Sequence, residues 1–179
     1  MSKRKIALFG GSFDPIHLGH TTVAASAAKQ IEAQEVVFIP AKSSPLKDVA
    51  PNASDNDRLR MIELAIEKNK NYQLSDYEIN KPSPSYTLHT VRYFQHEYGD
   101  RALICWLIGA DSLDELPRWY GVTDLIDECN LCTMFRAGCE EPDFTKFAVL
   151  WGHERVAKLQ KNIIKTPFDP KDAEIFIFI

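Results

Sequence analysis

The sequence contains no long apolar run that could serve as a membrane span or a signal peptide. After a basic start, the first apolar stretch covers only residues 6–9, which is far too short for the apolar region of a signal peptide. Cysteine is also scarce, with four residues in a chain of 179. Because no secretory signal accompanies these cysteines, we expect reduced thiols and a cytoplasmic protein.

The sequence also lacks a strong excess of charge, internal repeats and low-complexity tracts. Its formal net charge of −4 argues against a protein that binds nucleic acid or membrane surfaces in general, but is compatible with a local basic site for a small anion. Hydrophobic residues make up 45% and charged residues 26% of the chain, as in ordinary globular proteins. The length suffices for one domain with a real core.

Short apolar runs alternate with helical patterns along the chain. Runs typical of strands lie at 5–10, 35–40, 72–79, 102–109 and 131–136, and two more, NIIKT and EIFIFI, close the sequence. Helical patterns cover 17–33, 54–68, 86–98, 112–116, 123–128 and 144–161. The alternation predicts a doubly wound α/β sheet with 102–109 as a central strand. Ligands should then bind at the carboxyl ends of the strands, near a change in strand order.

Two of the helical patterns carry clear end signals. Ser54 is a predicted N-cap for 54–68, and Gly99 is a predicted stop for 86–98. The apolar side of 54–68 is predicted to consist of Leu59, Ile62, Leu64 and Ile66. That of 86–98 is predicted to consist of Leu88, Val91, Phe94 and Tyr98.

The segment GGSFDPIHLGH, residues 10–20, concentrates glycine and histidine directly after the first strand. Gly10 and Gly11 lack side chains, so the backbone there can approach a ligand closely. His17 and His20 are spaced i, i+3 on the first turn of the next helix, where they share one face. A helix N-terminus attracts phosphate, so this pattern predicts a phosphate site with two imidazole donors. Gly19 leaves room between the rings.

A histidine pair has other uses as well. Zinc sites on helices usually space the histidines i, i+4, as in HExxH, and no such motif occurs in this chain. The remaining alternative is that the two histidines cap the helix or lie exposed. The position of the full motif after a strand favours the phosphate site.

G-x-F-D-P-x-H-x-G-H resembles the signature of the nucleotidylyltransferase superfamily, which is defined by H-x-G-H. PSYTLHTV (84–91), LIGADSLDELPRWY (107–120) and FIPAKSSPLK (38–47) resemble motifs of bacterial nicotinate-mononucleotide adenylyltransferases. The resemblance covers about residues 5 to 136. It implies a Rossmann-like doubly wound parallel sheet with flanking helices. It also implies an enzyme of NAD and pyridine nucleotide biosynthesis that transfers AMP from ATP to nicotinate mononucleotide and releases pyrophosphate.

The resemblance also implies the site residues. Catalysis falls to His17 and His20, and no residue is assigned to a metal. The residues implied in ATP binding are Gly10, Gly11, Ser12, Phe13, His17, His20, Gly109 and Asp111, and those implied in substrate binding are Lys47, Tyr86, Thr87, Trp119 and Arg136. Mg²⁺ would accompany ATP.

The chemistry of these residue types agrees with the assignments. The carboxylate of Asp111, after the central strand, can accept a hydrogen bond from a ribose hydroxyl. Trp119 offers a flat face for a pyridine ring. Tyr86 and Thr87 open a helix whose backbone donors can meet a nicotinate carboxylate. The alternatives are core packing for Trp119 and Tyr120, and a solvated loop for Lys42 and Lys47.

The last part of the chain departs from the family pattern. The family carries I-S-S-T-x-I-R near its C-terminus, where hydroxyls and an arginine hold ATP phosphates, and we expect one domain over 1–179 without that segment. At the matching place the sequence has Asp172, Ala173 and Phe176. An aspartate there would repel phosphate. Arg136 or Lys165 are the candidate replacement cations. EIFIFI is interpreted as a sheet strand, an interface such as that of a homo-oligomer, or the product of a shifted reading frame.

Some further residues are assigned no role in the chemistry. CNLC (129–132) lacks the second ligand pair of a zinc site, so we interpret it as structural. His89, His96 and His153 are expected at the surface or in packing, with His89 the one to test. Two alternative functions stay open. One is a nucleotide-binding protein with impaired catalysis. The other is an adenylyltransferase for another mononucleotide, such as nicotinamide mononucleotide.

Overall fold

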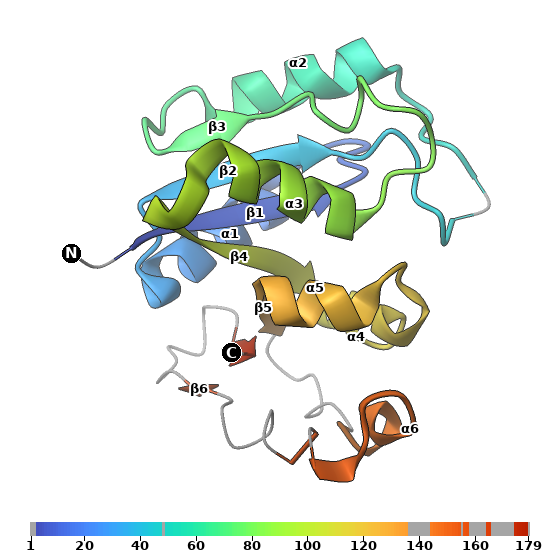
Figure 1. Ribbon diagram of the computed structural model, residues 1–179. Coiled ribbons are helices and arrows are strands. Elements are labelled where there is room, and N and C mark those ends of the chain that lie inside the picture. Colours follow the sequence, from blue (N-terminus) through green and yellow to red (C-terminus); the bar gives the residue numbers. More distant parts are fainter. Residues whose placement is uncertain are drawn as a thin grey trace.

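The computed structural model describes residues 3–47, 49–135, 144–154, 156–157, 164–165 and 174–178 (Figure 1). Its centre is one sheet in the order β3-β2-β1-β4-β5-β7-β6. The first five strands run parallel, and β7 is antiparallel to both β5 and β6. The bounds are β1 (Arg4–Gly11), β2 (Glu35–Pro40), β3 (Tyr72–Leu74), β4 (Ala102–Gly109), β5 (Asn130–Phe135), β6 (Ile164–Lys165) and β7 (Glu174–Phe178).

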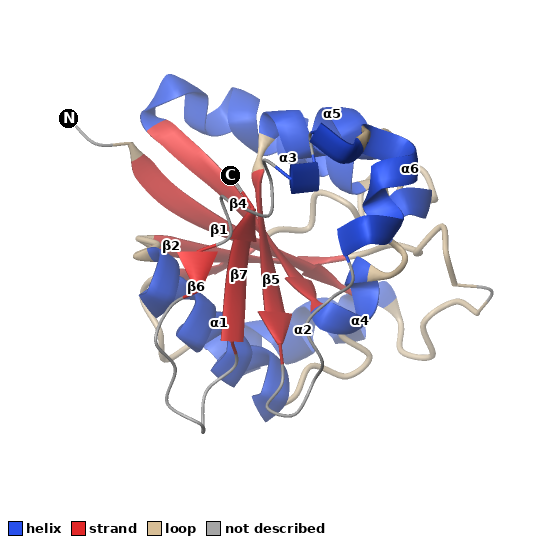
Figure 2. Cartoon of the chain, turned by 90° about the horizontal axis from the view of Figure 1, so that it is seen from below, coloured by secondary structure: helices blue, strands red, loops and turns tan. Residues whose placement is uncertain are grey.

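Helices cover both faces of the sheet (Figure 2). One face packs against α1 (Leu18–Ile31) and α2 (Asp55–Ile66), and the other against α3 (Thr87–Tyr98) and α5 (Val122–Glu128). The short helices are α4 (Ala110–Leu113) and α6 (Ala148–Trp151), with 3₁₀ turns at Gly99–Arg101, Leu116–Arg118 and Phe144–Phe147. Successive strand residues alternate between the two cores: Ile6 and Leu8 face α3, whereas Ala7 and Phe9 face α1.

This arrangement confirms the predicted doubly wound α/β sheet and the central place of β4. The chain proceeds from β1 to β2 and β3 on one side, then crosses to β4 on the other side of β1. The change in strand order therefore lies between β1 and β4. Ligand sites of open α/β sheets form at the carboxyl ends of the strands at such a point. The fold thus brings two segments to one edge of the sheet. One begins with Gly10 and Gly11 at the end of β1, and the other is 109–111 at the end of β4.

Two predictions in the middle of the chain were wrong in part. Only Tyr72–Leu74 of the expected strand 72–79 pairs with β2, because the following residues close hydrogen-bonded turns such as Asn80 N–H to the Asp76 carbonyl. On α2, Ser54 is the N-cap as expected, and its hydroxyl accepts from Asp57 N–H. Leu64, however, is half exposed, and Arg58 takes a buried place on the stripe with Ile62 and Ile66.

The far part of the chain also differs from expectation. The helix expected over 144–161 is broken at Gly152, whose φ of 78° lies in the left-handed region. The first five residues of EIFIFI do form a strand, since β7 pairs with β5 from Leu131–Phe178 to Phe135–Glu174. Arg136, Asp172 and Ala173 lie outside the described residues. Among the helices of the described part of the chain, none is long and apolar enough to cross a membrane.

Candidate active site

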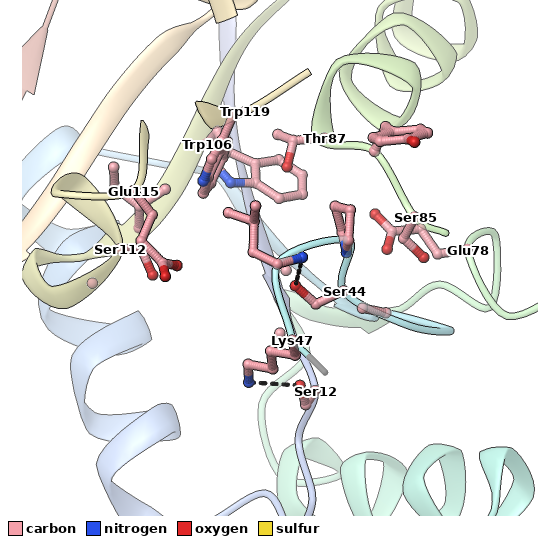
Figure 3. A pocket seen from close by; sticks show the side chains of 18 of the residues that line it. Ser12, Ser44, Lys47, Glu78, Ser85, Thr87, Trp106, Ser112, Glu115 and Trp119 are labelled. Carbon is pink, nitrogen blue, oxygen red and sulfur yellow. Dashed lines mark hydrogen bonds between the residues drawn. The ribbon is translucent and has the colours of Figure 1, made fainter. Parts of the chain in front are cut away.

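A cavity of about 200 Å³ opens at the carboxyl ends of β1, β2 and β4 (Figure 3). Its walls come from the turn after β1, the loop after β2, the start of α3 and the segment after β4. Among the predicted site residues, Gly10, Gly11, Ser12, Lys47, Tyr86, Thr87, Gly109 and Trp119 line it. Segments far apart in the sequence are therefore brought together as the switch in strand order predicts.

Gly10 is needed in part for packing against the protein itself. A Cβ atom at Gly10 would lie 2.5 Å from Cζ2 of Trp106 and 2.7 Å from Cη2. Trp106 is buried on β4 and lines the same cavity. The absent side chain of Gly10 thus lets an indole ring, which forms part of the cavity wall, lie against the backbone. Close approach of a ligand to this glycine stays a prediction. At Gly11 a Cβ would meet the Phe13 ring at 3.2 Å.

The two histidines lie together at the start of α1. The His17 and His20 ring centroids are 3.9 Å apart, and the His20 ring packs edge-on against Phe13 at 5.1 Å. Nδ1 of His20 accepts from the backbone N–H of His17 at 3.2 Å. In a neutral ring this acceptor places the proton on Nε2, so Nε2–H is the donor that His20 can present. The close pair agrees with the predicted shared face.

Gly19 has the role that the sequence indicated. A Cβ atom there would lie 2.9 Å from Cε1 of His17, so a side chain would displace that ring. His17 is the N-cap of α1 rather than its first residue, and the first turn of this helix contains no acidic side chain. The N-terminus of α1 is therefore an electropositive end with two imidazoles on it. Phe9 links it to the cavity, since Phe9 lines the cavity and its ring lies 6.1 Å from His20.

The turn that follows β1 is held by a carboxylate. Asp14 accepts from the backbone N–H groups of Asn52 and Ala53 at 2.5 and 3.0 Å. These hydrogen bonds lower the pKa of Asp14, and the nearby positive charge of Arg58 acts in the same direction. These hydrogen bonds fix the turn that follows Gly10 and Gly11, called the glycine turn below, against the segment that leads into α2.

Lys47 spans from the loop after β2 to the turn after β1. Its Nζ donates to Oγ of Ser12 at 3.0 Å, across the mouth of the cavity (Figure 3). Lys42 is directed away from this point, since its Nζ donates to the Ile79 carbonyl and pairs with Asp55 at 3.7 Å. The structure thus separates the two lysines: Lys47 contributes a cation to the cavity wall, and Lys42 holds neighbouring segments together.

The N-terminus of α3 forms the opposite wall. Tyr86 is its N-cap with no side-chain capping bond, and its carbonyl accepts from His89 and Thr90 N–H. Tyr86, His89 and Tyr120 form an aromatic cluster, with Tyr86 and Tyr120 centroids 4.7 Å apart. Trp119 both packs against the core and lines the cavity. Core packing, the alternative for Trp119, therefore accounts for only part of this side chain, and the rest faces the cavity.

Asp111 lies at the edge of the cavity beside Gly109. A Cβ atom at Gly109 would collide with Oδ1 of Asp111, so the glycine makes room for that carboxylate. The lining residues do not include Asp111, Phe13, His17 or His20. These residues thus lie outside the cavity wall, with Asp111 next to the lining residue Gly109 and the His20 ring 6.1 Å from that of the lining residue Phe9. Arg136 lies outside the described residues.

Sequence reasoning missed several residues of the cavity wall. Glu78 was expected in a strand, but it is buried in a turn at the cavity, where burial raises the pKa of its carboxyl group. Trp106 carried no signal beyond its apolar run. Ser85 lies within the motif PSYTLHTV and could have been found there, since its hydroxyl accepts from Lys42 N–H. The other lining residues that were not predicted include Ser44, Leu46, Ser112 and Glu115.

Three cysteines of the described residues, Cys105, Cys129 and Cys132, lie near one another and are not among the residues that line the cavity. Cys105 on β4 and Cys132 on β5 are hydrogen-bonded, which lowers the pKa of the Cys105 thiol and raises that of Cys132. Cys129 ends α5, and burial raises its pKa. In the part of the chain that the structure describes, no three His, Cys, Asp or Glu side chains form a group that could hold a metal ion.

The chain was compared with known families and proteins. The cytidylyltransferase-like family matches residues 8–169. A protein of Rhodopirellula baltica named a "probable nicotinate-nucleotide adenylyltransferase" is 36% identical over 166 residues, which cover 93% of this chain and 77% of that protein. A protein of Methylacidiphilum infernorum with the same name is 43% identical over 122 residues, which cover 68% of this chain and only 59% of that protein.

The fold also has solved counterparts. The nicotinic acid mononucleotide adenylyltransferase of Plasmodium falciparum, solved in complex with NaAD, superimposes with a TM-score of 0.67 at 18% identity. The superposition covers 87% of this chain and 70% of that one, and it shows a shared Rossmann-like fold. Taken with the sequence matches, these findings show that the chain belongs to the cytidylyltransferase-like family and, within it, to the nicotinate-nucleotide adenylyltransferases, which are nucleotidyltransferase enzymes.

Proposed function

We propose that this chain transfers AMP from ATP to nicotinate mononucleotide, giving nicotinate adenine dinucleotide and pyrophosphate. The observation that carries the proposal is the cavity between the glycine turn, Lys47, the N-terminus of α3 and Trp119. Its lining runs from the glycines at the end of β1 and Lys47, close to the electropositive start of α1, to the aromatic and polar start of α3. A dinucleotide product needs both kinds of end in one site.

The adenine nucleotide would occupy the end beside α1. Phosphoryl transfer needs chiefly positioning and stabilisation of spread negative charge. His17 and His20 would donate to the phosphates. Because Nδ1 of His20 accepts from the backbone N–H of His17, Nε2–H would be the donor of a neutral His20 ring. Gly10, Gly11, Ser12 and Phe13 would lie along the triphosphate, and Gly109 and Asp111 along the ribose.

The acceptor would occupy the end beside α3. Backbone N–H groups at Tyr86 and Thr87 would meet the ring carboxylate, and Trp119 would contact the pyridine ring. Lys47, already across the cavity mouth, would meet phosphate charge. Arg136 stays a predicted contact. The 5′-phosphate of the acceptor is anionic near pH 7, because its second pKa is about 6, so it can attack the α-phosphorus without a strong general base or a covalent enzyme intermediate.

Mg²⁺ enters this proposal together with ATP. Mg²⁺ keeps several water ligands and is commonly held by substrate phosphates with one or two carboxylates. The described residues fit that mode, because acidic side chains such as Asp111 border the cavity without forming a group of three that could hold a metal ion. The bound ion would neutralise charge on the pyrophosphate. A cytoplasmic location stays a prediction.

A second candidate is a protein that binds nucleotide with impaired turnover. It is favoured by Phe176, which stands where the family's C-terminal motif has an arginine. Phe176 lies in β7, opposite Thr133 of β5. A phenylalanine provides no cation for phosphate. A positioned arginine can contribute roughly 10³ or more to a phosphoryl-transfer rate.

One assay separates the candidates. Pyrophosphate release is followed with ATP, Mg²⁺ and nicotinate mononucleotide, in parallel with nicotinamide mononucleotide, while calorimetry measures binding. Turnover with the nicotinate acceptor supports the proposal, and faster turnover with the nicotinamide acceptor reassigns the substrate. Binding of both nucleotides without pyrophosphate release contradicts the proposal and supports the second candidate.

A further inference from the structure

Glu78 is a buried acid in the wall of the cavity. Its exposed fraction is 5%, and it lies after β3 in the turn that faces the start of α3. Oε1 of Glu78 accepts from the Thr90 hydroxyl at 2.6 Å. Glu78 and Ser85 lie next to one another in the cavity wall (Figure 3). The mechanism proposed above gives this carboxyl group no part.

The described residues give Glu78 no ion-pair partner, although the nearby Lys42 is positively charged. The ammonium of Lys42 instead donates to the carbonyl of the next residue, Ile79, at 2.9 Å and pairs with Asp55. A buried carboxyl group without a partner cation favours its neutral form. Burial accordingly raises the pKa of Glu78, while hydrogen bonds from Thr90 and Ser85 oppose that shift in part.

Glu78 lies within one helical turn of the N-terminus of α3. The Thr90 hydroxyl that donates to Glu78 also lies 3.4 Å from the carbonyl of Tyr86, the N-cap. On the proposed function, a ring carboxylate binds at this N-terminus. Two carboxyl groups would then share one end of the cavity. Two carboxyl groups that lie close together do not both ionise readily, so the pair retains one proton.

We propose that Glu78 is a specificity-determining residue for the acceptor. At a pH where Glu78 is ionised in the free protein, binding of a ring that carries a carboxylate takes up one proton from solvent, which the ring carboxylate and Glu78 then share. Binding of a ring that carries a neutral amide takes up none, because ionised Glu78 can accept from the amide N–H. This inference rests on the proposed function and deepens it.

Several other groups that titrate surround Glu78. On its own segment and the segments beside it they are Asp76, Tyr77, Lys81, Lys42, Tyr86, His89 and Tyr93, with Asp55 paired to Lys42. Their charges act on either acceptor, and both acceptors carry the same 5′-phosphate. The test therefore uses the ratio between the two acceptors and changes Glu78 alone.

The experiment measures KM for nicotinate mononucleotide and for nicotinamide mononucleotide from pH 6.5 to 9, at saturating ATP and Mg²⁺. In the wild-type protein the ratio of the nicotinate KM to the nicotinamide KM should rise with pH, approaching about tenfold per pH unit once Glu78 ionises in the free protein. In Glu78→Gln, which keeps the shape and the acceptor for Thr90, the ratio should become independent of pH. Glu97→Gln, an exposed change on α3, should leave the wild-type slope.

Calorimetry gives a second measurement that needs no variant. Each acceptor is titrated into the wild-type protein in two buffers of different ionisation enthalpy at several pH values from 6.5 to 9. Uptake that rises with pH toward one proton with the nicotinate acceptor, and stays near zero with the nicotinamide acceptor, supports the role of Glu78. Equal proton uptake, parallel KM profiles, or an unchanged slope in Glu78→Gln overturns it. Failure of the proposed function looks different: no turnover of nicotinate mononucleotide at any pH.

Discussion

The buried guanidinium of Arg58 donates through Nη1 to the backbone carbonyl of Ser12 at 2.8 Å, and the same nitrogen reaches the Ala41 carbonyl at 2.8 Å. Ser12 follows β1 and Ala41 follows β2, and both line the cavity. Asp55 accepts from the other terminal nitrogen at 2.6 Å. The Arg58 side chain of α2 therefore holds the loops after β1 and β2 at a fixed distance from one another.

Replacing Arg58 should destabilise the fold strongly. Arg58→Met leaves two carbonyls and the part-exposed Asp55 without their donor, and a hydrogen bond to a charged group contributes about 1.5–3 kcal/mol. The free energy of unfolding, measured in urea, checks this. Arg60→Met is the matched control, because Arg60 is on the same helix in an exposed pair with Glu63 and should change stability by no more than about 1 kcal/mol. Equal effects of the two changes would contradict the role of Arg58.

Regular elements with a continuous pattern could be predicted from the sequence. The run 35–40 forms β2 with the expected bounds, because a short continuous apolar run that ends at a proline suits a parallel strand covered on both faces. The helix after Ser54 begins where its capping hydroxyl predicts. The segment 75–79 could not be predicted in this way, because the Ser75 hydroxyl bonds the Tyr77 N–H and diverts the backbone into a turn.

The residues of the candidate site likewise include some that the sequence could predict and some that it could not. Gly10, Lys47, Thr87 and Trp119 could be placed together in advance, since parallel strands bring the loops at their carboxyl ends to one edge. The buried polar groups could not, because no periodicity marks them. Arg58 and Glu78 sit in patterns that usually signal exposed side chains, and only tertiary hydrogen bonds explain their burial.

Replacing His20 should reduce turnover without unfolding the protein. Loss of one positioned donor to a developing oxyanion costs roughly 10²–10³ in kcat. His20→Ala should show this loss in the pyrophosphate assay, with a circular dichroism spectrum like that of the wild type. His96→Ala is the control, since His96 is 88% exposed on α3 and should keep full activity. An unchanged kcat in His20→Ala would remove His20 from the catalytic residues.

A methyl group at Gly10 should displace Trp106. The added Cβ would lie 2.5 Å from Cζ2 of the indole, which is closer than carbon atoms pack. Overpacking of a core costs about 1–3 kcal/mol, so Gly10→Ala should lower the free energy of unfolding by that amount and alter the tryptophan fluorescence. Trp106→Phe removes the outer indole ring, and the double variant should recover part of the loss. Additive effects of the two changes would show that the glycine is needed for another reason.

Asp14 should make the stability of the protein depend on acid pH. Its pKa in the fold is held below the ordinary aspartate value of 3.8 by the Asn52 and Ala53 N–H groups, so the folded protein binds fewer protons than the unfolded chain. The stabilisation is present above pH 3.8 and is lost as the pH falls through the folded-state pKa. Asp14→Asn should therefore be less stable than the wild type at pH 6, and the difference should shrink below pH 3.8. Urea midpoints at both pH values test this, with Asp76→Asn as an exposed control whose carboxylate accepts from the Asn80 side chain. A difference that stays constant with pH would mean that Asp14 acts through packing rather than charge.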